Sequence, residues 1–312
     1  MSSRVSTGGA YRGIEDSFVE VDGARVHFQR AGSGRPLLLI HGLVGSAQNW
    51  RLNIGNLADI ATVYAIDMLN MGESDRVPGL DAGLEAIADR IERWMQVVGI
   101  DEADIAGHSH GGAVAMMLAA RHPERVGRLV LFAPANPFCD LGKQLIAFYN
   151  SRVGQFAARF APSLPVSLKM FALGRMYGDS SRVTLESLDG YTAGLTRPGT
   201  VAHVLQVVRR WYEDMGILRT ALTGLGHRRA LLIWGDHDRA VGLASARQLQ
   251  KLLPKSQLHV IPGVGHLAFE EMPDVCNRIV REWLSAPEPV AQPAHAFKKR
   301  HAKKNLKQLK AC

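Results

Sequence analysis

The fold of this chain is decided by one stretch of sequence, Ile105-Ala106-Gly107-His108-Ser109-His110-Gly111-Gly112. Within it, Ser109 stands in the frame Gly-x-Ser-x-Gly, after an apolar run and before a run of helix formers. A serine in this frame is expected on a sharp turn between a buried strand and a helix, with a strained backbone and an exposed hydroxyl. Gly107 and Gly111 fit that turn because strand and helix approach too closely for side chains. The alternative is that Ser109 only caps a helix.

The flanking segments favour the turn. Leu84–Val98 has helical periodicity and precedes a short strand at Ala103–Ala106. After the turn, Ala113–Ala120 is apolar and rich in helix formers, and it ends shortly before a proline. Val126–Phe132 is then predicted as the next buried strand. Ser109 therefore lies inside a strand–helix–strand unit, where its hydroxyl is a candidate nucleophile and the amide of His110 a candidate donor to an oxyanion.

The remaining strands also alternate with helical segments, which predicts an α/β fold with a mostly parallel central sheet covered on both faces. Asp22-Gly23 predicts a hairpin between the first two strands. The further segments expected are strands at Ser17–Val21, Ala24–Arg30, Pro36–Ile40, Ala61–Ile66, Ala230–Trp234 and Ser256–Ile261, and a last helix at Pro273–Leu284.

The strand pattern stops between residues 136 and 227. That stretch predicts helices at Leu145–Phe160, Val166–Tyr177 and Val201–Tyr212, punctuated by prolines and glycines. We therefore expect residues 136–227 to form an inserted helical lid on a core of residues 15–135 and 228–285. Residues 1–14 are expected to be an N-terminal extension, and residues 286–312 a Pro-rich linker with a basic, disordered tail.

The net charge comes mainly from that tail. The chain of 312 residues has a formal net charge of +8, and seven Lys or Arg residues with no acid stand in 298–312. Without these seven, residues 1–297 carry a net charge of +1. The folded body therefore predicts no specific nucleic-acid partner. The tail is expected either to be solvated or to contact an anionic surface. Composition does not determine an oligomeric state.

No apolar run approaches the roughly 18 residues that cross a bilayer. The first ten residues lack the apolar segment of a secretory signal. The cysteines, Cys139, Cys276 and Cys312, are scattered, which fits a reducing compartment better than a disulfide framework. These features predict a cytoplasmic protein.

A nucleophilic serine needs a base, and the base needs an orienting carboxylate. Asp236 and Asp238 follow the strand Ala230–Trp234, and His266 follows the strand Ser256–Ile261. Because the carboxyl ends of parallel strands share one edge of the sheet, we expect these side chains to meet near Ser109. The alternative for His266 is a core histidine.

These motifs together resemble those of the α/β-hydrolase superfamily, in its lidded serine-hydrolase branch that includes esterases and carbon–carbon hydrolases. The resemblance covers roughly residues 15–285. Its marks are His41-Gly42, Asp67 with Gly72-Glu73-Ser74, the Gly107–Gly111 turn, Trp234–Asp238, and Gly265-His266 with Glu270 and Pro273. It implies a triad of Ser109, Asp238 and His266, and an oxyanion hole formed by the backbone amides of Leu43 and His110.

The resemblance assigns Asp238 rather than Asp236 to the triad. Asp236 is the alternative, with bonds to backbone amides of its own turn as its structural role. The chain departs from the family pattern at Gly242, where a proline is usual, and this bears on the rigidity of the loop. His41 and Asp67 are expected to hold their loops, and His108 to pack behind the turn.

The expected substrate contacts are His110, Trp50 and Met68, beside an apolar pocket. No metal site is predicted, because no motif such as His-x-x-x-His on a helix occurs, and no cofactor is expected. Arginines of the insert are candidates for binding a substrate carboxylate or are simply solvated: Arg175, Arg197, Arg209 and Arg210.

The expected function is a cofactor-free serine hydrolase. It would form an acyl-enzyme on a small or medium apolar ester, thioester or activated carbon–carbon bond. Ser109 at the turn excludes dehalogenase-like and epoxide-hydrolase-like relatives, which place an aspartate there. Two alternatives stay open: an acyltransferase with the same triad, and a non-catalytic ligand receptor on the same scaffold.

Overall fold

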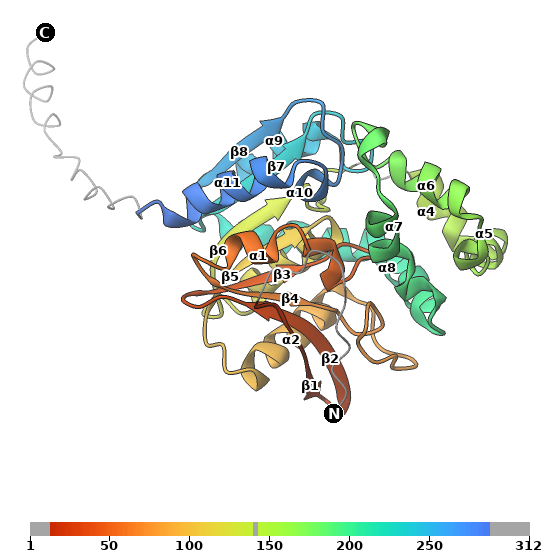
Figure 1. Ribbon diagram of the computed structural model, residues 1–312, viewed down its shortest axis with the longest axis horizontal. Helices are drawn as coiled ribbons and strands as arrows, with labels where there is room; N and C mark the ends of the chain where they lie inside the picture. Colours follow the sequence, from red (N-terminus) through yellow and green to blue (C-terminus); the bar gives the residue numbers. More distant parts are fainter. Residues whose placement is uncertain (1–12, 140–142, 288–312) are drawn as a thin grey trace, which may run out of the picture.

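The computed structural model describes residues 13–139 and 143–287 (Figure 1). The strands in these residues form one sheet in the order β1-β2-β4-β3-β5-β6-β7-β8. Their bounds are β1 Glu15–Val21, β2 Ala24–Ala31, β3 Pro36–Ile40, β4 Thr62–Ile66, β5 Ala103–His108, β6 Val126–Phe132, β7 Ala230–Gly235 and β8 Ser256–Ile261. β2 pairs antiparallel with β1 and β4, and every other neighbouring pair is parallel. The predicted α/β fold class is confirmed.

Two hydrophobic clusters separate the faces of the sheet because side chains alternate along each strand. In β3, Leu38 and Ile40 join one cluster, whereas Leu37 and Leu39 join the other. The first cluster is covered by α2 (Leu84–Val97), α3 (His110–Arg121), part of α8 (Thr200–Ala221) and α9 (Leu243–Leu252). The second is covered by α1 (Ile54–Leu57), α10 (Ala268–Glu271) and α11 (Pro273–Ser285). Burial on both faces explains why the central strands are apolar throughout.

The insert, residues 136–227, connects β6 to β7, and the part that the structure describes contains helices and no strand. Its helices are α4 (Lys143–Asn150), α5 (Arg152–Ala158), α6 (Val166–Gly174), α7 (Leu185–Thr192) and α8. Short 3₁₀ turns lie between them at Ala161–Ser163, Ser180–Arg182 and Gly194–Thr196, and a fourth, Leu222–Leu225, follows α8. In Figure 1, α4, α5 and α6 lie together at one end of the molecule, and α8 runs from there back to the core.

Two differences from the predicted helices have local causes. The helix expected over Leu145–Phe160 is two helices, because Ser151 caps the start of α5 by accepting a hydrogen bond from Gly154 N. α7 is an element that the sequence analysis missed. Thr184 caps it by accepting from Ser187 N, a signal that the sequence contains.

The expectations for residues 1–12, and for the tail from residue 288 on, lie outside the described residues. Within the described part of the chain, no helix combines the length and apolar character needed to span a membrane.

Candidate active site

Ser109 is the single residue between the end of β5 and the start of α3. Its backbone has φ 50° and ψ −119°, a conformation that L residues rarely adopt. Backbone hydrogen bonds hold it there: Ser109 N donates to Phe132 O at 3.0 Å, and Ser109 O accepts from Ala135 N at 2.8 Å. The side chain makes no capping hydrogen bond to α3. The helix-capping alternative is therefore wrong, and the strained turn is the one that the motif predicts.

The flanking glycines are required by close backbone contacts. A Cβ at Gly107 would run into the backbone of Gly111. A Cβ at Gly111 would run into the carbonyl group of His41. The strand and the helix start therefore approach each other closely at this turn, as the sequence predicts. The loop after β3 also lies against the turn.

His266 lies in the loop between β8 and α10 and is joined to Asp238. Its Nδ1 is 2.8 Å from Asp238 Oδ2, and both side chains are buried. The other carboxylate oxygen of Asp238 accepts from Ala240 N and Val241 N, each at 2.8 Å. Because the carboxylate is an acceptor, Nδ1 of His266 carries a proton, which leaves Nε2 as the ring nitrogen that can accept one.

Asp236 has a different partner. Its Oδ1 accepts a hydrogen bond from Gly263 N at 2.7 Å, in the loop that leads to His266. Asp236 therefore ties two loops together. The structural role expected for it, hydrogen bonds to the backbone amides of its own turn, differs from this contact. Of the two aspartates, Asp238 is the one that contacts the histidine.

His108 packs behind the turn and links it to His266. Its Nε2 donates to the backbone carbonyl of His266 at 3.1 Å, and the two rings lie 4.6 Å apart between centroids. Burial and the neighbouring His266 hold the pKa of His108 well below its usual value. A neutral His108 therefore positions the His266 loop beside Ser109.

The loop after β3 carries the Leu43 amide beside the turn. A Cβ at Gly42 would contact the Cβ of Ser109 at 3.3 Å, which places this loop against the nucleophile candidate. His41 holds the loop: its Nδ1 donates to Gly42 O at 2.8 Å, and its Nε2 accepts from Met68 N at 3.1 Å. His110 is the first residue of α3, where N–H groups have no carbonyl partner four residues earlier in the helix.

Asp67 fixes the neighbouring loops, as expected. One carboxylate oxygen accepts from Ala47 N, and the other accepts from Glu73 N at 2.7 Å and from His27 Nδ1 at 2.8 Å. His27 also contacts Asp16 at 3.1 Å through Nε2. These two carboxylates oppose the effect of burial and raise the pKa of His27 to about 9.

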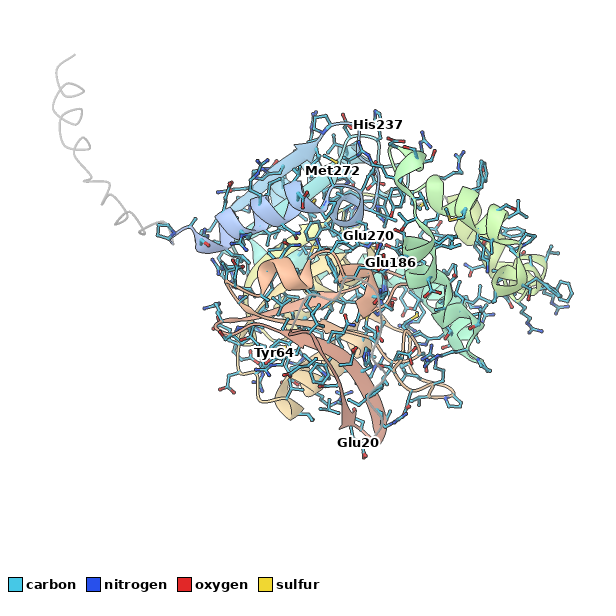
Figure 2. The ribbon with its side chains drawn as sticks, in the orientation of Figure 1. Glu20, Tyr64, Glu186, His237, Glu270 and Met272 are labelled. Atoms are coloured by element: carbon cyan, nitrogen blue, oxygen red, sulfur yellow. The ribbon has the colours of Figure 1, made fainter. Side chains whose placement is uncertain are left out.

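A charged network that the sequence analysis missed joins the core to the insert. Arg51 contacts Glu270 at 2.8 Å and Glu186 at 3.3 Å, and Tyr177 Oη donates to Glu270 at 2.8 Å. Figure 2 shows Glu270 and Glu186 near α7, where insert and core meet. Glu271 accepts from Gly178 N at 2.9 Å and from Gly265 N at 2.8 Å. Glu271 therefore bridges the insert and the loop of His266.

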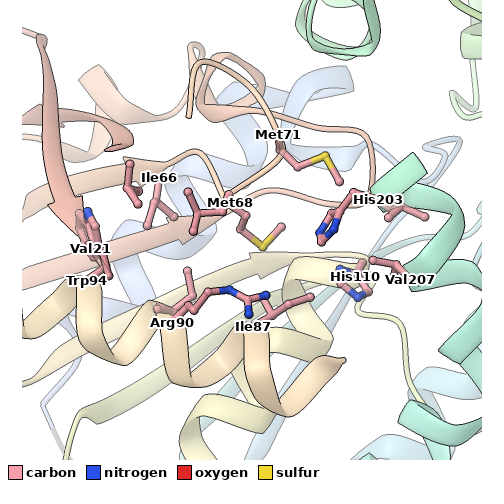
Figure 3. Close-up of a pocket in the computed structure, with 14 residues that line it drawn as sticks. Val21, Ile66, Met68, Met71, Ile87, Arg90, Trp94, His110, His203 and Val207 are labelled. Carbon is pink, nitrogen blue, oxygen red and sulfur yellow. The ribbon is translucent and has the colours of Figure 1, made fainter. Parts of the chain in front are cut away.

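Two cavities adjoin Leu43. The large cavity, of about 240 Å³, lies between the loop after β3 and the insert, and apolar side chains line it: Leu43, Val44, Ile146, Val204, Val208 and Trp211. The small cavity, of about 30 Å³, lies between α2, α3 and α8 (Figure 3). Met68 and His110 line the small cavity.

The other predicted contacts lie elsewhere. Trp50 is buried in the core, where its ring packs 4.3 Å from Phe269 and 5.7 Å from Phe132 between centroids. Trp50 lines neither of the two cavities. The candidate arginines Arg175, Arg197, Arg209 and Arg210 do not line these two cavities. Among the described residues, no group of three or more His, Cys, Asp or Glu side chains is arranged to hold a metal ion.

A family model described as alpha/beta hydrolase fold matches residues 35–273, and the chain belongs to this family. It is 32% identical over 276 residues to the 2-hydroxymuconate semialdehyde hydrolase of Pseudomonas sp. (strain CF600), covering 86% of this chain and 93% of that protein. It is also 33% identical over 276 residues to the dihydrolipoyllysine-residue acetyltransferase component of the acetoin cleaving system of Cupriavidus necator. That match covers 86% of this chain and 68% of that protein.

Among solved structures, the chain is similar to a meta-cleavage product hydrolase from Pseudomonas fluorescens IP01. The TM-score is 0.74 at 28% identity, and the match covers 86% of this chain and 97% of that one. The family and its named relatives identify the protein as an enzyme of the hydrolase class. The expected family and class of enzyme are thereby confirmed.

Proposed function

We propose that the protein is a serine hydrolase in which Ser109 is the nucleophile, His266 the general base and Asp238 the residue that orients it. The observation that carries the proposal is the 2.8 Å hydrogen bond between His266 Nδ1 and Asp238 Oδ2. His108, next to Ser109, contacts both the ring and the backbone of His266, which supports the placement of the base beside the nucleophile.

In the proposed reaction, Ser109 Oγ attacks the substrate carbonyl carbon while its proton passes to His266 Nε2. The amides of Leu43 and His110 donate hydrogen bonds to the oxyanion that forms. The bond to the leaving group then breaks, and the leaving group takes the electron pair and the proton from His266. A water molecule, deprotonated by His266, attacks the acyl-enzyme, which releases a carboxylic acid and restores Ser109.

We favour an activated carbon–carbon bond next to a carbonyl group as the substrate class. Two of the relatives carry the names 2-hydroxymuconate semialdehyde hydrolase and meta-cleavage product hydrolase. The large apolar cavity supports an apolar group on one side of the carbonyl carbon. Esters and thioesters follow the same chemistry, with an oxygen or sulfur leaving group.

Acyl transfer is a second candidate because one relative is named as an acetyltransferase component. In that case an alcohol or thiol replaces water as the acceptor for the acyl group on Ser109. Analysis of the products formed with and without an added thiol distinguishes the two. A thioester product would favour transfer, and the free acid alone would favour hydrolysis.

We also propose that the insert acts as a lid that selects substrates. Its helices supply one wall of the large cavity, whereas the loops that carry Ser109, Asp238 and His266 belong to the core. Substrate choice and chemistry would then depend on different parts of the chain.

A fluorophosphonate probe tests the nucleophile. The wild-type protein should take up one equivalent, and Ser109→Ala should abolish labelling, because the probe reacts with a serine that a histidine base activates. Ser181→Ala, at an exposed position in the insert, is the matched control and should label like the wild type. Labelling that persists in Ser109→Ala would refute the proposal.

A further inference from the structure

The outer end of the insert exposes apolar side chains that the proposed chemistry does not use. Among the described residues, thirteen large hydrophobic side chains are exposed, and eight of them fall within residues 148–171. Single exposed hydrophobic residues are common, but a concentration of them marks an interaction surface. The segment includes α5 and α6, which lie at one end of the molecule (Figure 1). Its exposed side chains, with the exposed cations up to residue 175, form a surface that we call the insert tip.

The exposed apolar residues of α5 and of the turn that follows it share one face. Val153, Phe156 and Phe160 stand at i, i+3 and i+7, and they are 70%, 62% and 53% exposed. The rings of Phe156 and Phe160 lie 5.1 Å apart between centroids. Gly154 and Ala158, on the other side of the helix, are buried, and Ala158 lines the large cavity. The two phenylalanines therefore face away from that cavity and are not walls for a substrate.

α6 adds to the same surface. Leu168 and Phe171, at i and i+3, are both more than half exposed. Between them, Lys169 Nζ donates to Pro162 O at 3.3 Å, in the 3₁₀ turn that follows Phe160. This hydrogen bond joins α6 to the end of the α5 segment, so the apolar residues of the two helices belong to one surface.

The charges of the insert tip have one sign. The sequence has no Asp or Glu between residues 141 and 178, whereas Arg152, Arg159 and Arg175 are exposed there. Within the described residues, no carboxylate forms an ion pair with any of these three arginines. The insert tip therefore combines exposed apolar groups with unpaired positive charge.

An open cleft beside the insert tip has the same charge. It has a volume of about 500 Å³ and lies between α5, the 3₁₀ turn Gly194–Thr196 and α8. Arg159, Arg197 and Arg209 line it, and no acidic residue does. Arg197 is paired with Glu73, but Arg159 and Arg209 have no carboxylate partner in the part of the chain that the structure describes. This end of the molecule therefore attracts anionic groups.

A second copy of the chain does not match this surface. A two-fold interface places the same surface on both sides, so the arginines would face one another with no acid from the tip between them. An anionic lipid surface matches both features. Its headgroups pair with the arginines, and the boundary of its acyl chains accepts the apolar side chains.

We propose that the insert tip docks on a membrane that contains anionic phospholipids. Phe156 and Phe160 enter the boundary between headgroups and acyl chains, and Arg152 and Arg159 pair with the headgroups. Docking places α5 between the bilayer and the large cavity, which Ala158 of the same helix lines. The docking does not depend on the role of Ser109.

Vesicle flotation of the full-length protein at physiological ionic strength tests the docking. The wild type should bind vesicles of equal parts phosphatidylcholine and phosphatidylglycerol more strongly than vesicles of phosphatidylcholine alone. Phe156→Ser/Phe160→Ser should lower the partition coefficient at least about tenfold, because two apolar side chains no longer enter the lipid. Arg152→Glu/Arg159→Glu should also lower it at least about tenfold on the anionic vesicles.

Matched control variants change the same residue types elsewhere. Phe18→Ser removes an exposed phenylalanine on β1. Arg247→Glu/Arg278→Glu makes the same change in net charge at exposed positions on α9 and α11. Both controls should bind within about twofold of the wild type, because charges distant from the docked surface are screened by salt. Every variant keeps the basic residues of 298–312, so their contribution to vesicle binding is constant.

Tryptophan fluorescence measures insertion directly. All five native tryptophans are buried, so a tryptophan placed at an exposed position dominates the response to lipid. The emission of Phe156→Trp should shift to shorter wavelength on anionic vesicles and should be quenched by brominated acyl chains. Phe18→Trp is the control and should show neither change.

The outcomes separate the docking from the proposed function. The docking would be overturned if the wild type did not bind the vesicles, if Phe156→Ser/Phe160→Ser bound as strongly as the wild type, or if brominated lipid did not quench Phe156→Trp. A dimer in solution that Phe156→Ser/Phe160→Ser dissociates would show that a second copy covers the insert tip, and would also overturn it. Fluorophosphonate labelling of Ser109 needs no lipid, so it tests the nucleophile independently.

Discussion

Asp236 and Asp238 are two aspartates, two residues apart, that have different roles. Asp238 follows β7 and contacts His266 through one oxygen, while amides of its own turn hold the other oxygen. Asp236 instead accepts a hydrogen bond from the backbone of the loop that leads to His266. The first contact selects the tautomer of the histidine, and the second fixes the position of the loop. Substituting each aspartate by asparagine therefore removes different properties.

We expect Asp238→Asn to lower kcat by about 10³- to 10⁴-fold. The new amide would donate to Nδ1 of His266, so Nε2 would carry the proton and could not accept one from Ser109. Asp236→Asn keeps an acceptor for Gly263 N and should cost roughly tenfold or less. Steady-state kinetics on one aryl ester provides the comparison. A larger loss in Asp236→Asn would show that the assignment of the two residues is wrong.

His27 stabilises the buried carboxylate of Asp67, which in turn holds the loops after β3 and β4. Its two carboxylate partners raise its pKa from the ordinary 6.5 to about 9. The folded state therefore binds a proton on His27 that the unfolded chain has released between these pH values. This contribution to stability is fully present below pH 6.5 and is lost as the pH rises through about 9.

We expect His27→Gln to show this dependence. The difference in free energy of unfolding between wild type and variant should be largest at pH 6 and should shrink toward pH 9.5, as measured by urea denaturation across that range. His259→Gln, on β8, is the matched control for the replacement of a histidine by glutamine. A difference that grows with pH would contradict a protonated His27.

α8 separates the two cavities because its faces differ. Val204 and Val208 line the large cavity, whereas His203 and Val207 line the small one. Further along the helix, Leu218 is fully buried in the core. One continuous helix therefore spans insert and core, which explains why α8 extends to Ala221, past the predicted end at Tyr212.

The sequence predicts the core better than the insert. β3, β6 and β8 have the predicted bounds because apolar runs ending at turn residues leave few alternatives. In the insert, α8 packs on other helices of the insert along its first half and on the core along its second half. The apolar periodicity therefore changes along the helix, and the sequence does not show that the helix continues past Tyr212. Ser109, Asp238 and His266 stand in recognisable loops. Arg51 and Glu186 carry no motif, and only the packing of α7 against the core brings them together.

The start of α9 provides a prediction about the Asp238 loop. Gly242 precedes α9 with φ −59° and ψ 139°, a conformation that proline adopts readily. No atom lies within 4 Å of a Cβ built there, and Ser245 N bonds the carbonyl of Gly242, which proline keeps. Gly242→Pro should raise the free energy of unfolding by about 0.4–1 kcal/mol by restricting the unfolded chain.

Chemical denaturation of Gly242→Pro and Gly242→Ala provides the measurement. The alanine variant should gain less, because alanine restricts the unfolded chain less than proline does. A loss of stability in the proline variant, with alanine neutral, would mean that the loop needs the freedom of glycine.

Core and insert act as one unit around the candidate site. His266 N donates to Met176 O at 2.6 Å, and Glu271 bonds both Gly178 N and Gly265 N. Arg51 and Glu270 add a charged contact that is largely buried. The middle of the insert is thus tied to the histidine loop, while α4, α5 and the first half of α8 enclose the large cavity.

This division predicts that a change in the large cavity alters selectivity rather than chemistry. Val208→Trp would fill part of the 240 Å³ with an indole and leave less room for long acyl groups. The ratio of kcat/KM for an octanoyl ester to that for an acetyl ester should fall by roughly tenfold or more. Val153→Trp, at an exposed position on α5, is the matched control and should keep the wild-type ratio. A ratio that Val208→Trp leaves unchanged would show that acyl groups bind outside this cavity.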